Sequence, residues 1–243
     1  MRTLSLASDI PVVVYNGSSG FMLSPDVGLT KKLFSTPHSH DDAQVLLNFA
    51  KRLGVVAQYY LEDCGEVFAV PLTKEHDALL EAYAGLTGRK QIIGTDYNTA
   101  ISQSCAAKIL LMSRNTEDLI ASAKDEFPCG KFNIIRGSPD PFFVEFLPAN
   151  ISKGSGLRNL CAASDIDIDE VVAFGDGEND AEFLKCAGLG VAMKNAKAAA
   201  KESADVILEV QIYTHCILRS SYIIFCVTFA LVDKRRRRCS VHA

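Results

Sequence analysis

A short loop holds the residues with the clearest chemical potential. Asp176 is flanked by Gly175 and Gly177, and Asn179 and Asp180 follow closely. Hard carboxylate oxygens are the ligands that Mg²⁺ prefers, and the unpaired N–H groups at the start of a helix attract phosphate. The spacing therefore predicts a site that holds a magnesium ion through Asp176 and Asp180 and binds an anion beside it.

The elements around this loop place it at the edge of a parallel sheet. Val171–Phe174 is β-branched and aromatic, as in a buried strand, and Glu178–Ala187 carries apolar residues on one helical face. A second strand, a helix and a third strand are predicted at Gly188–Met193, Asn195–Ala204 and Asp205–Leu208. Ligands bind at the carboxyl ends of such strands. This order favours a binding site over the alternative, a turn whose Asn and Asp only cap a helix.

Several segments resemble one known family. Phe174–Asp180 reads Phe-Gly-Asp-Gly-Glu-Asn-Asp, and Leu184–Gly188, Gly190–Ala196 and Lys201–Asp205 continue the same pattern. Upstream, Val144–Pro148 leads to Ser152-Lys153-Gly154, and Pro11–Gly17 reads Pro-Val-Val-Val-Tyr-Asn-Gly. Over about residues 9 to 209, the chain resembles the haloacid dehalogenase-like (HAD) hydrolases, and among them the Cof-type phosphatases with a large α/β cap.

The resemblance implies a fold and a reaction. The fold is α/β: a Rossmann-like parallel-sheet core, incomplete at its N-terminus, with an inserted α/β cap domain. In that family an aspartate attacks a phosphate monoester, water hydrolyses the aspartyl-phosphate, and Mg²⁺ screens the charges. A lysine and a divalent cation suit such a reaction, because phosphoryl transfer is catalysed mainly by positioning and charge neutralisation.

By matching position, the resemblance also implies the role of each site residue. Asp176 is a metal ligand, and Asp180 is a second ligand or the support of the first. Lys153 neutralises the charge of the phosphoryl group and completes a catalytic set with Asp176 and Asp180. The implied substrate contacts are Lys153, Asn179, Asn16 and Gly17.

Two motifs of the family are missing from the sequence. The family opens with Asp-x-Asp-Gly-Thr, which supplies the nucleophile and the general acid, and then places a phosphate-binding Ser or Thr before the first core helix. The 243 residues contain no Asp-x-Asp-Gly-Thr, and no such Ser or Thr segment precedes Pro11. A core without its central strand leaves neighbouring strands unpaired. We therefore expect Met1 to be an internal start and the chain as written not to hydrolyse a substrate.

The segment after Glu209 departs from the family pattern. Cys216–Val232 is largely apolar and is followed by the basic run Lys234–Arg238. This resembles a membrane tail with a basic flank, but the unbroken apolar part, Tyr222–Val232, is shorter than the roughly twenty residues that a span needs. We favour a translated intron or a shifted reading frame, with membrane contact through residues 210–243 as the alternative.

Helices and strands alternate between the two core pieces, as they do in the family's cap. The predicted helices are Asp41–Leu53, Glu75–Tyr83 and Glu117–Phe127. The predicted strands are a hairpin of Val55–Leu61 with Glu66–Leu72, a single strand at Ala106–Met112, and a closing pair of Lys131–Arg136 with Phe142–Leu147. We therefore divide the chain into a first core piece (1–27), the cap (28–149), a second core piece with the metal and phosphate motif (150–209) and the atypical tail (210–243).

Charge and cysteine content limit the partners and the compartment. Before residue 210 the chain has 19 Lys and Arg against 28 Asp and Glu, a net charge of −9, so no nucleic-acid binding is expected. The eight cysteines show no metal-site spacing and are interpreted as reduced thiols. The first residues lack the apolar stretch of a secretory signal. We expect a cytoplasmic protein whose partner is a small phosphorylated metabolite, with no protein partner.

Three functions from different classes remain open. The first and favoured one is a magnesium-dependent phosphatase that hydrolyses phosphate monoesters of small metabolites, namely sugar phosphates, nucleotides or cofactor phosphates, with this chain as a fragment of it. The second is a non-catalytic module that binds phosphorylated ligands. The third is a fragment of a P-type ATPase, whose phosphorylation domain carries a closely similar Gly-Asp-Gly-x-Asn-Asp motif, although no Asp-Lys-Thr-Gly-Thr sequence is present.

Overall fold

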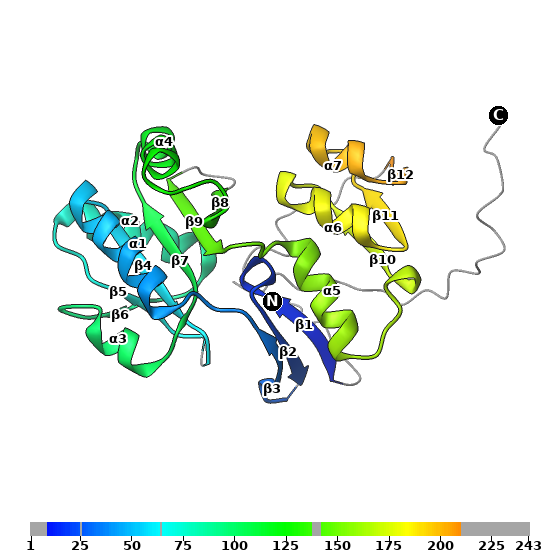
Figure 1. Cartoon of the computed structure of the whole chain (residues 1–243), viewed down its shortest axis with the longest axis horizontal. Coiled ribbons are helices and arrows are strands. Elements are labelled where there is room, and N and C mark those ends of the chain that lie inside the picture. The colour runs from blue at the N-terminus through cyan, green and yellow to red at the C-terminus, as the bar shows by residue number, and fades with distance from the viewer. Residues whose placement is uncertain (1–8, 25, 64, 138–141, 210–243) are drawn as a thin grey trace.

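The fold has two parts, a cap and a core, that lie side by side (Figure 1). A computed structural model describes residues 9–24, 26–63, 65–137 and 142–209. The predicted tail, 210–243, and the region around Met1 lie outside the described residues. Within the described ranges, no helix is both long and apolar enough for a membrane span.

The second core piece confirms the predicted parallel sheet. Strands β10 (Val172–Gly175), β11 (Leu189–Ala192) and β12 (Val206–Ile207) pair in parallel in this order. The first crossover is a 3₁₀ turn, η3 (Glu178–Asp180), followed by α6 (Ala181–Cys186), and the second is α7 (Ala198–Ser203). The predicted helix over 178–187 is therefore a tight turn and a short α-helix, which leaves the loop side chains close to the strand end.

The first core piece is an antiparallel sheet that the sequence did not predict. Strands β1 (Ile10–Val14), β2 (Ser19–Ser24) and β3 (Gly28–Ser35) pair in chain order, with the turn η1 (Tyr15–Gly17) between the first two. Strand β3 falls within the predicted cap segment, 28–149, yet it pairs along its length with β2. The sheet of the first core piece therefore continues into the segment predicted as the start of the cap.

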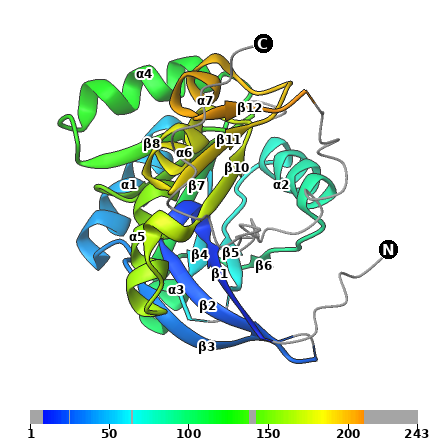
Figure 2. The ribbon, with the colours of Figure 1, turned by 90° about the vertical axis from the view of Figure 1, so that its right-hand side faces the viewer.

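Helix α5 joins the two core pieces. It spans Lys153–Ala163 and lies beside β1 (Figure 2). Val13 of β1, Leu157 of α5 and Ala173 of β10 belong to one buried apolar cluster. Burial of such side chains is the main favourable term in folding, so α5 fixes the antiparallel sheet against the strand that leads into the Asp176 loop.

The cap is a six-stranded sheet in the order β6-β5-β4-β7-β9-β8. Its strands are β4 (Val56–Leu61), β5 (Val67–Ala69), β6 (Ile92–Ile93), β7 (Ala106–Met112), β8 (Phe132–Arg136) and β9 (Phe143–Pro148). Its helices are α1 (His40–Leu53), α2 (Lys74–Thr87), α3 (Asn98–Gln103) and α4 (Thr116–Glu126). The predicted hairpin and the closing strand pair are present and antiparallel, whereas β6 and α3 were not predicted.

Both faces of the cap sheet are covered. One apolar cluster contains Phe49 of α1 and Leu119 of α4, and a second contains Tyr83 of α2 together with Val14 and Phe21 of the core. Every residue of β4, β7 and β9 is buried as a result. The second cluster shows which side of the cap sheet meets the core. On that side the aromatic rings of Tyr15 and Tyr60 pack edge to face, with their centroids 5.9 Å apart.

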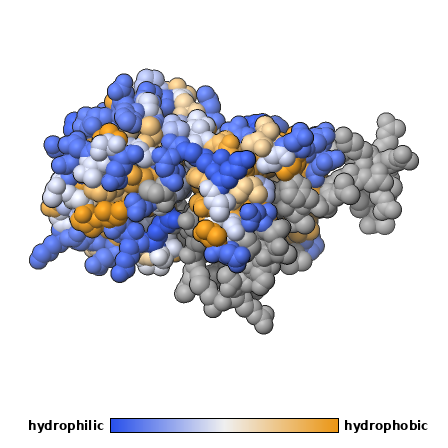
Figure 3. Space-filling view, turned by 90° about the horizontal axis from the view of Figure 1, so that it is seen from below, coloured by the Kyte–Doolittle hydropathy of each residue, from blue (hydrophilic) through white to orange (hydrophobic). Residues whose placement is uncertain are grey.

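The surface in Figure 3 mixes hydrophilic side chains with smaller apolar patches. Large apolar side chains are exposed at several places in the described chain, singly at Val27 and Leu72 and as neighbours at Ile92–Ile93 and Val206–Ile207. Scattered apolar residues of this kind are normal on a protein surface. The exposed apolar residues therefore need no functional explanation.

Candidate functional site

The Asp180 carboxylate closes the loop that carries Asp176. Strand β10 ends at Gly175, so Asp176 stands at the carboxyl edge of the parallel sheet. Asp180 folds back over this end, and its Oδ2 accepts hydrogen bonds from the backbone N–H groups of Asp176 at 3.0 Å and Gly177 at 2.8 Å. A Cβ at position 175 would lie 2.7 Å from that of Asp180. Gly175 thus makes room for the side chain that shapes the loop.

Lys153 reaches the same carboxylate from α5. Its Nζ donates to Asp180 Oδ1, and the two side chains are 9% and 8% exposed. The start of α5 is fixed by a capping box, in which the Ser152 hydroxyl accepts from the Ser155 N–H at 3.1 Å and the Ser155 hydroxyl accepts from the Ser152 N–H at 2.9 Å. Both Asp180 oxygens are therefore bound to protein donors.

Asp176 is left as the available carboxylate. Burial raises its pKa above the ordinary value, the charge of Asp180 raises the pKa further, and Lys153 lowers it. Among the described residues, no other side chain donates a hydrogen bond to it. A negative charge at Asp176 is thus poorly compensated by the protein, and a bound cation would compensate it.

These donors fit a magnesium ion that is shared with a ligand. Mg²⁺ is usually held through one or two carboxylates, with water and substrate phosphate completing the shell. Asp176 can supply such a ligand, whereas Asp180 takes the supporting position because its oxygens are occupied. In the described ranges no group of three or more Asp, Glu, His or Cys residues could hold a metal by itself, so the cation would depend on additional oxygens.

The predicted substrate contacts Asn16 and Asn179 lie together. Asn16 is buried in the turn after β1, and its Oδ1 accepts a hydrogen bond from Asn179 Nδ2 at 3.3 Å. Tyr15 and Asn16 both have φ of 54°, an uncommon backbone conformation for residues with a side chain. Such strain persists only where the surroundings hold it.

Two glycines press this turn against α5. A Cβ on Gly17, whose φ is +111°, would overlap the Ser152 carbonyl oxygen, and a Cβ on Gly156 would lie 2.6 Å from the Gly17 Cα. The turn therefore touches the first turn of the helix that carries Lys153. The structure thus brings all six predicted residues into one region. Asp180 and Lys153 meet in the buried ion pair, and the backbone N–H of Asp176 binds Asp180. Asn16 and Asn179 meet through their amides, and Gly17 contacts α5.

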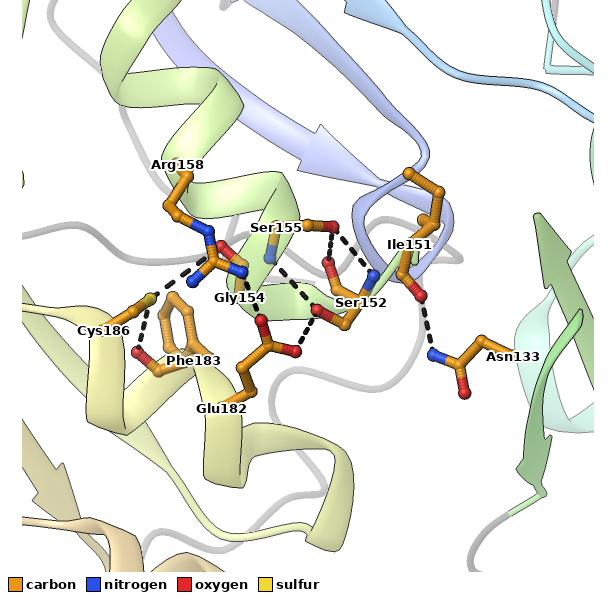
Figure 4. Close-up of polar contacts among 9 residues, drawn as sticks. All are labelled: Asn133, Ile151, Ser152, Gly154, Ser155, Arg158, Glu182, Phe183 and Cys186. Carbon is orange, nitrogen blue, oxygen red and sulfur yellow. Dashed lines mark hydrogen bonds and ion pairs between the residues drawn. The ribbon is translucent and has the colours of Figure 1, made fainter. Parts of the chain in front are cut away.

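A polar network ties α6 to α5 behind the site (Figure 4). Glu182 accepts hydrogen bonds from the Ser152 hydroxyl and from Arg158. The sulfur of Cys186 lies 3.8 Å from the Gly154 carbonyl oxygen and 3.4 Å from that of Phe183. Sequence reasoning missed Glu182 and Arg158, because exposed charges on short helices carry no motif. They keep the loop between β10 and α6 beside Lys153.

Sequence reasoning also missed a buried charged pair in the cap. Lys108 of β7 lies 3.0 Å from Glu145 of β9, and the second Glu145 oxygen accepts from Asn16 Nδ2 at 2.7 Å. A usable signal was present, since each residue is the single charge in an otherwise uncharged strand. Charged residues are almost never fully buried unless they are paired.

A family model described as haloacid dehalogenase-like hydrolase matches residues 2–212. The chain belongs to this family. A solved haloacid dehalogenase-like hydrolase from Bacteroides thetaiotaomicron superposes with a TM-score of 0.64 at 27% identity, over 79% of this chain and 68% of that one. A HAD/Cof-like hydrolase from Plasmodium vivax gives a TM-score of 0.64 at 19% identity, over 80% and 65%. The predicted resemblance to Cof-type HAD hydrolases with a cap is confirmed.

Curated relatives match over shorter stretches. This HAD-like chain is 52% identical over 61 residues to a phosphoglycolate phosphatase of Methanopyrus kandleri, and the match covers 25% of the chain and 26% of that protein. The chain thus matches about a quarter of the length of this relative. The match establishes relatedness over this stretch.

Proposed function

We propose that the site binds the phosphate group of a small metabolite together with Mg²⁺, as part of a phosphatase that hydrolyses phosphate monoesters. The observation that carries the proposal is the buried Lys153–Asp180 pair, whose acid also binds two backbone N–H groups of the Asp176 loop. This arrangement holds a cationic ammonium and an available carboxylate in fixed positions. A preorganised site of this kind is what phosphoryl transfer requires.

Each residue has a defined part in the proposal. Asp176 binds the cation, and the cation screens the negative charge of the phosphate. Lys153 donates to the phosphate oxygens while Asp180 holds its ammonium in place, and Asn179 and the Asn16–Gly17 turn contact the substrate. The names of relatives support a phosphatase, since the Methanopyrus kandleri protein is called a phosphoglycolate phosphatase. A sugar phosphate, nucleotide or cofactor phosphate is the substrate class we propose.

Hydrolysis also needs a nucleophile. The Asp-x-Asp-Gly-Thr sequence of the family does not occur in these 243 residues. We propose that the nucleophilic carboxylate comes from a segment outside this sequence, and that the chain as given binds without turnover. A non-catalytic binding module is therefore the second candidate. The family match and the structural neighbour favour a HAD-like hydrolase over the third alternative, a P-type ATPase fragment.

The test compares binding and hydrolysis. Calorimetric titration of the chain with MgCl₂ in the presence of inorganic phosphate should show saturable binding that Asp176→Asn abolishes. Asp169→Asn removes an equal charge from an exposed position nearby and should bind like the original chain. Absence of magnesium binding would exclude the proposal.

A second assay separates the two candidates. A chain extended with an Asp-x-Asp-Gly-Thr strand should release phosphate from monoesters only with Mg²⁺, and Asp176→Ala should stop the release. If the protein isolated from its source binds phosphorylated ligands but releases none, the binding module is correct. The cytoplasmic location and the lack of nucleic-acid binding stay predictions beside this proposal.

A further inference from the structure

A buried ion pair in the cap lies within a mostly apolar layer. Lys108 and Glu145 sit on neighbouring strands, and their side chains are 9% and 11% exposed. Glu145 faces Leu110 across the ladder, so Lys108 is its diagonal neighbour on the same sheet face. Apolar residues of similar volume often stabilise a fold as well as a buried pair does. Stability alone therefore gives no reason for these charges.

Lys108 keeps Glu145 in place on the cap side. Its Nζ lies 3.0 Å from Glu145 Oε1 and 4.5 Å from the centre of the Tyr60 ring, where a cation is attracted to the π face. Burial by itself lowers the pKa of Lys108, but the charge of Glu145 and the hydrogen bond to it raise the pKa above its ordinary value. The lysine is thus charged, and one oxygen of Glu145 is committed to it.

The other oxygen of Glu145 leaves the cap and reaches the core. Glu145 Oε2 accepts from Asn16 Nδ2 at 2.7 Å, a buried contact between residues 129 positions apart in the chain. Asn16 lies in the strained turn that touches α5. The hydrogen bond therefore links the cap sheet to the turn that faces the Asp176 loop.

The direction of each amide follows from the chemistry of the carboxylate. An ionised carboxylate only accepts hydrogen bonds, so Asn16 must turn its NH₂ group to Glu145 and its carbonyl oxygen to Asn179. Asn179 must then donate with its own NH₂ group, as it does at 3.3 Å. Its oxygen is left facing the loop, where a Cβ on Gly177 would lie 2.7 Å from Asn179 Oδ1. Amide oxygens are suitable ligands for hard cations or their bound water.

We propose that Glu145 is a positioning residue of the candidate site. From the cap, it sets the orientation of the Asn16 amide and, through Asn16, that of Asn179, so that the Asn179 oxygen faces the Asp176 loop. Lys108 holds Glu145 for this task. Contact between cap and core thereby controls the affinity of the loop for a divalent cation. This inference rests on the proposed binding of a cation at Asp176.

The first experiment measures Mn²⁺ binding to the full chain by electron paramagnetic resonance. Glu145→Gln keeps the size of the side chain but can present an NH₂ group to Asn16, which allows the Asn16 amide to reverse. We expect the affinity for Mn²⁺ to fall roughly 10-fold, as for loss of an outer partner of a metal ligand. Glu126→Gln is the matched control, because it makes the same substitution in the cap at a residue that pairs with Arg52 and contacts no member of the relay, and it should keep the original affinity.

A rescue variant separates orientation from general support. In Glu145→Gln/Asn16→Asp the carboxylate moves to position 16, where it accepts from the introduced glutamine amide and also from Asn179. The orientation of Asn179 is then restored, so Mn²⁺ affinity should return to within about 3-fold of the original, because substitutions within one hydrogen-bond network are not additive. The ¹⁵N signal of the Asn179 side-chain amide should shift in the single variant and move back in the double variant.

The outcomes are distinct. If the original chain binds no Mn²⁺, the proposed function and this inference both fail. If it binds Mn²⁺ and Glu145→Gln binds equally well, only the positioning role is wrong, and a loss without rescue also overturns it. Should Glu145→Gln fail to fold, Lys108→Met/Glu145→Leu replaces the pair with apolar residues, and the same 10-fold loss is expected.

Discussion

Two buried lysine–carboxylate pairs lie on either side of the Asn16 turn, and they differ in what holds the acid. In the core, Asp180 binds Lys153 and two backbone N–H groups of its own loop. In the cap, Glu145 binds Lys108 and the side chain of Asn16, which belongs to the other part of the molecule. The core pair therefore stabilises a local conformation, whereas the cap pair depends on contact between cap and core.

Breaking the core pair should give the largest effect. Lys153→Met leaves Asp180 buried without its cation, and removing one partner of a buried pair lowers the free energy of unfolding by about 3–5 kcal/mol. Urea unfolding followed by circular dichroism measures this loss. Lys185→Met removes an exposed lysine from α6 and should change stability by less than about 0.5 kcal/mol. Equal stability of the two variants would show that the core pair is not needed for folding.

Replacing both members of each pair should sharpen the contrast. Lys108→Met/Glu145→Leu substitutes apolar side chains for the pair and leaves one buried donor, the Asn16 amide, without its acceptor, so the free energy of unfolding should fall by about 1–3 kcal/mol. Lys153→Met/Asp180→Leu also removes the acceptor of the Asp176 and Gly177 N–H groups. Each buried N–H left without an acceptor costs about 1–3 kcal/mol. A core double variant as stable as the cap double variant would contradict the local role of Asp180.

The turn between the two pairs should be sensitive to a single methyl group. In Gly17→Ala the new Cβ meets the Ser152 carbonyl, at a φ of +111° that residues with a side chain rarely adopt. We expect a loss of at least about 2 kcal/mol. Gly54→Ala is the matched control, since Gly54 has φ of +65° with no atom within 4 Å of the added Cβ, and it should lose only about 1 kcal/mol. Thermal unfolding of both variants provides the comparison.

The same contrast explains what could be predicted from sequence. Each member of the core pair lies in its own short motif, Ser152-Lys153-Gly154 and Phe174–Asp180, and the strand–helix order around Asp176 identified both the parallel sheet and the loop. The β1–β3 sheet escaped prediction although Asn16-Gly17 and Pro25-Asp26 are turn signals, because the resemblance placed the start of the cap at Gly28 and so separated β3 from β2. The role of Glu145 could not be derived, because its partner Asn16 is 129 positions away. The apolar periodicity of a buried strand predicts burial but no long-range contact.

The smallest effect concerns pH and the Asp176 carboxylate. Its pKa is raised in the folded chain by burial and by Asp180, so the folded state binds this proton more tightly than the unfolded state. The resulting stability is fully present below the ordinary value of 3.8 and is lost as pH rises through the raised value. The Asn side chain of Asp176→Asn does not titrate, so this variant does not lose stability through that group as pH rises. With EDTA present, the thermal midpoint of the original chain should therefore fall relative to Asp176→Asn as pH rises from about 3.5 to about 6.5.

Magnesium should reverse this difference, because a cation bound at Asp176 stabilises the charged form and the folded state that holds it. The midpoint of the original chain should rise with added MgCl₂, while that of Asp176→Asn stays the same. In Lys108→Met/Glu145→Leu the pH-dependent difference should persist, since Lys153 and Asp180 still face Asp176, but the response to magnesium should shift to higher concentrations. If the pH-dependent difference and the response to magnesium both changed in this variant, the cap pair would act on the Asp176 carboxylate itself. The distinction between a core pair with a local role and a cap pair that acts through Asn16 would then be wrong.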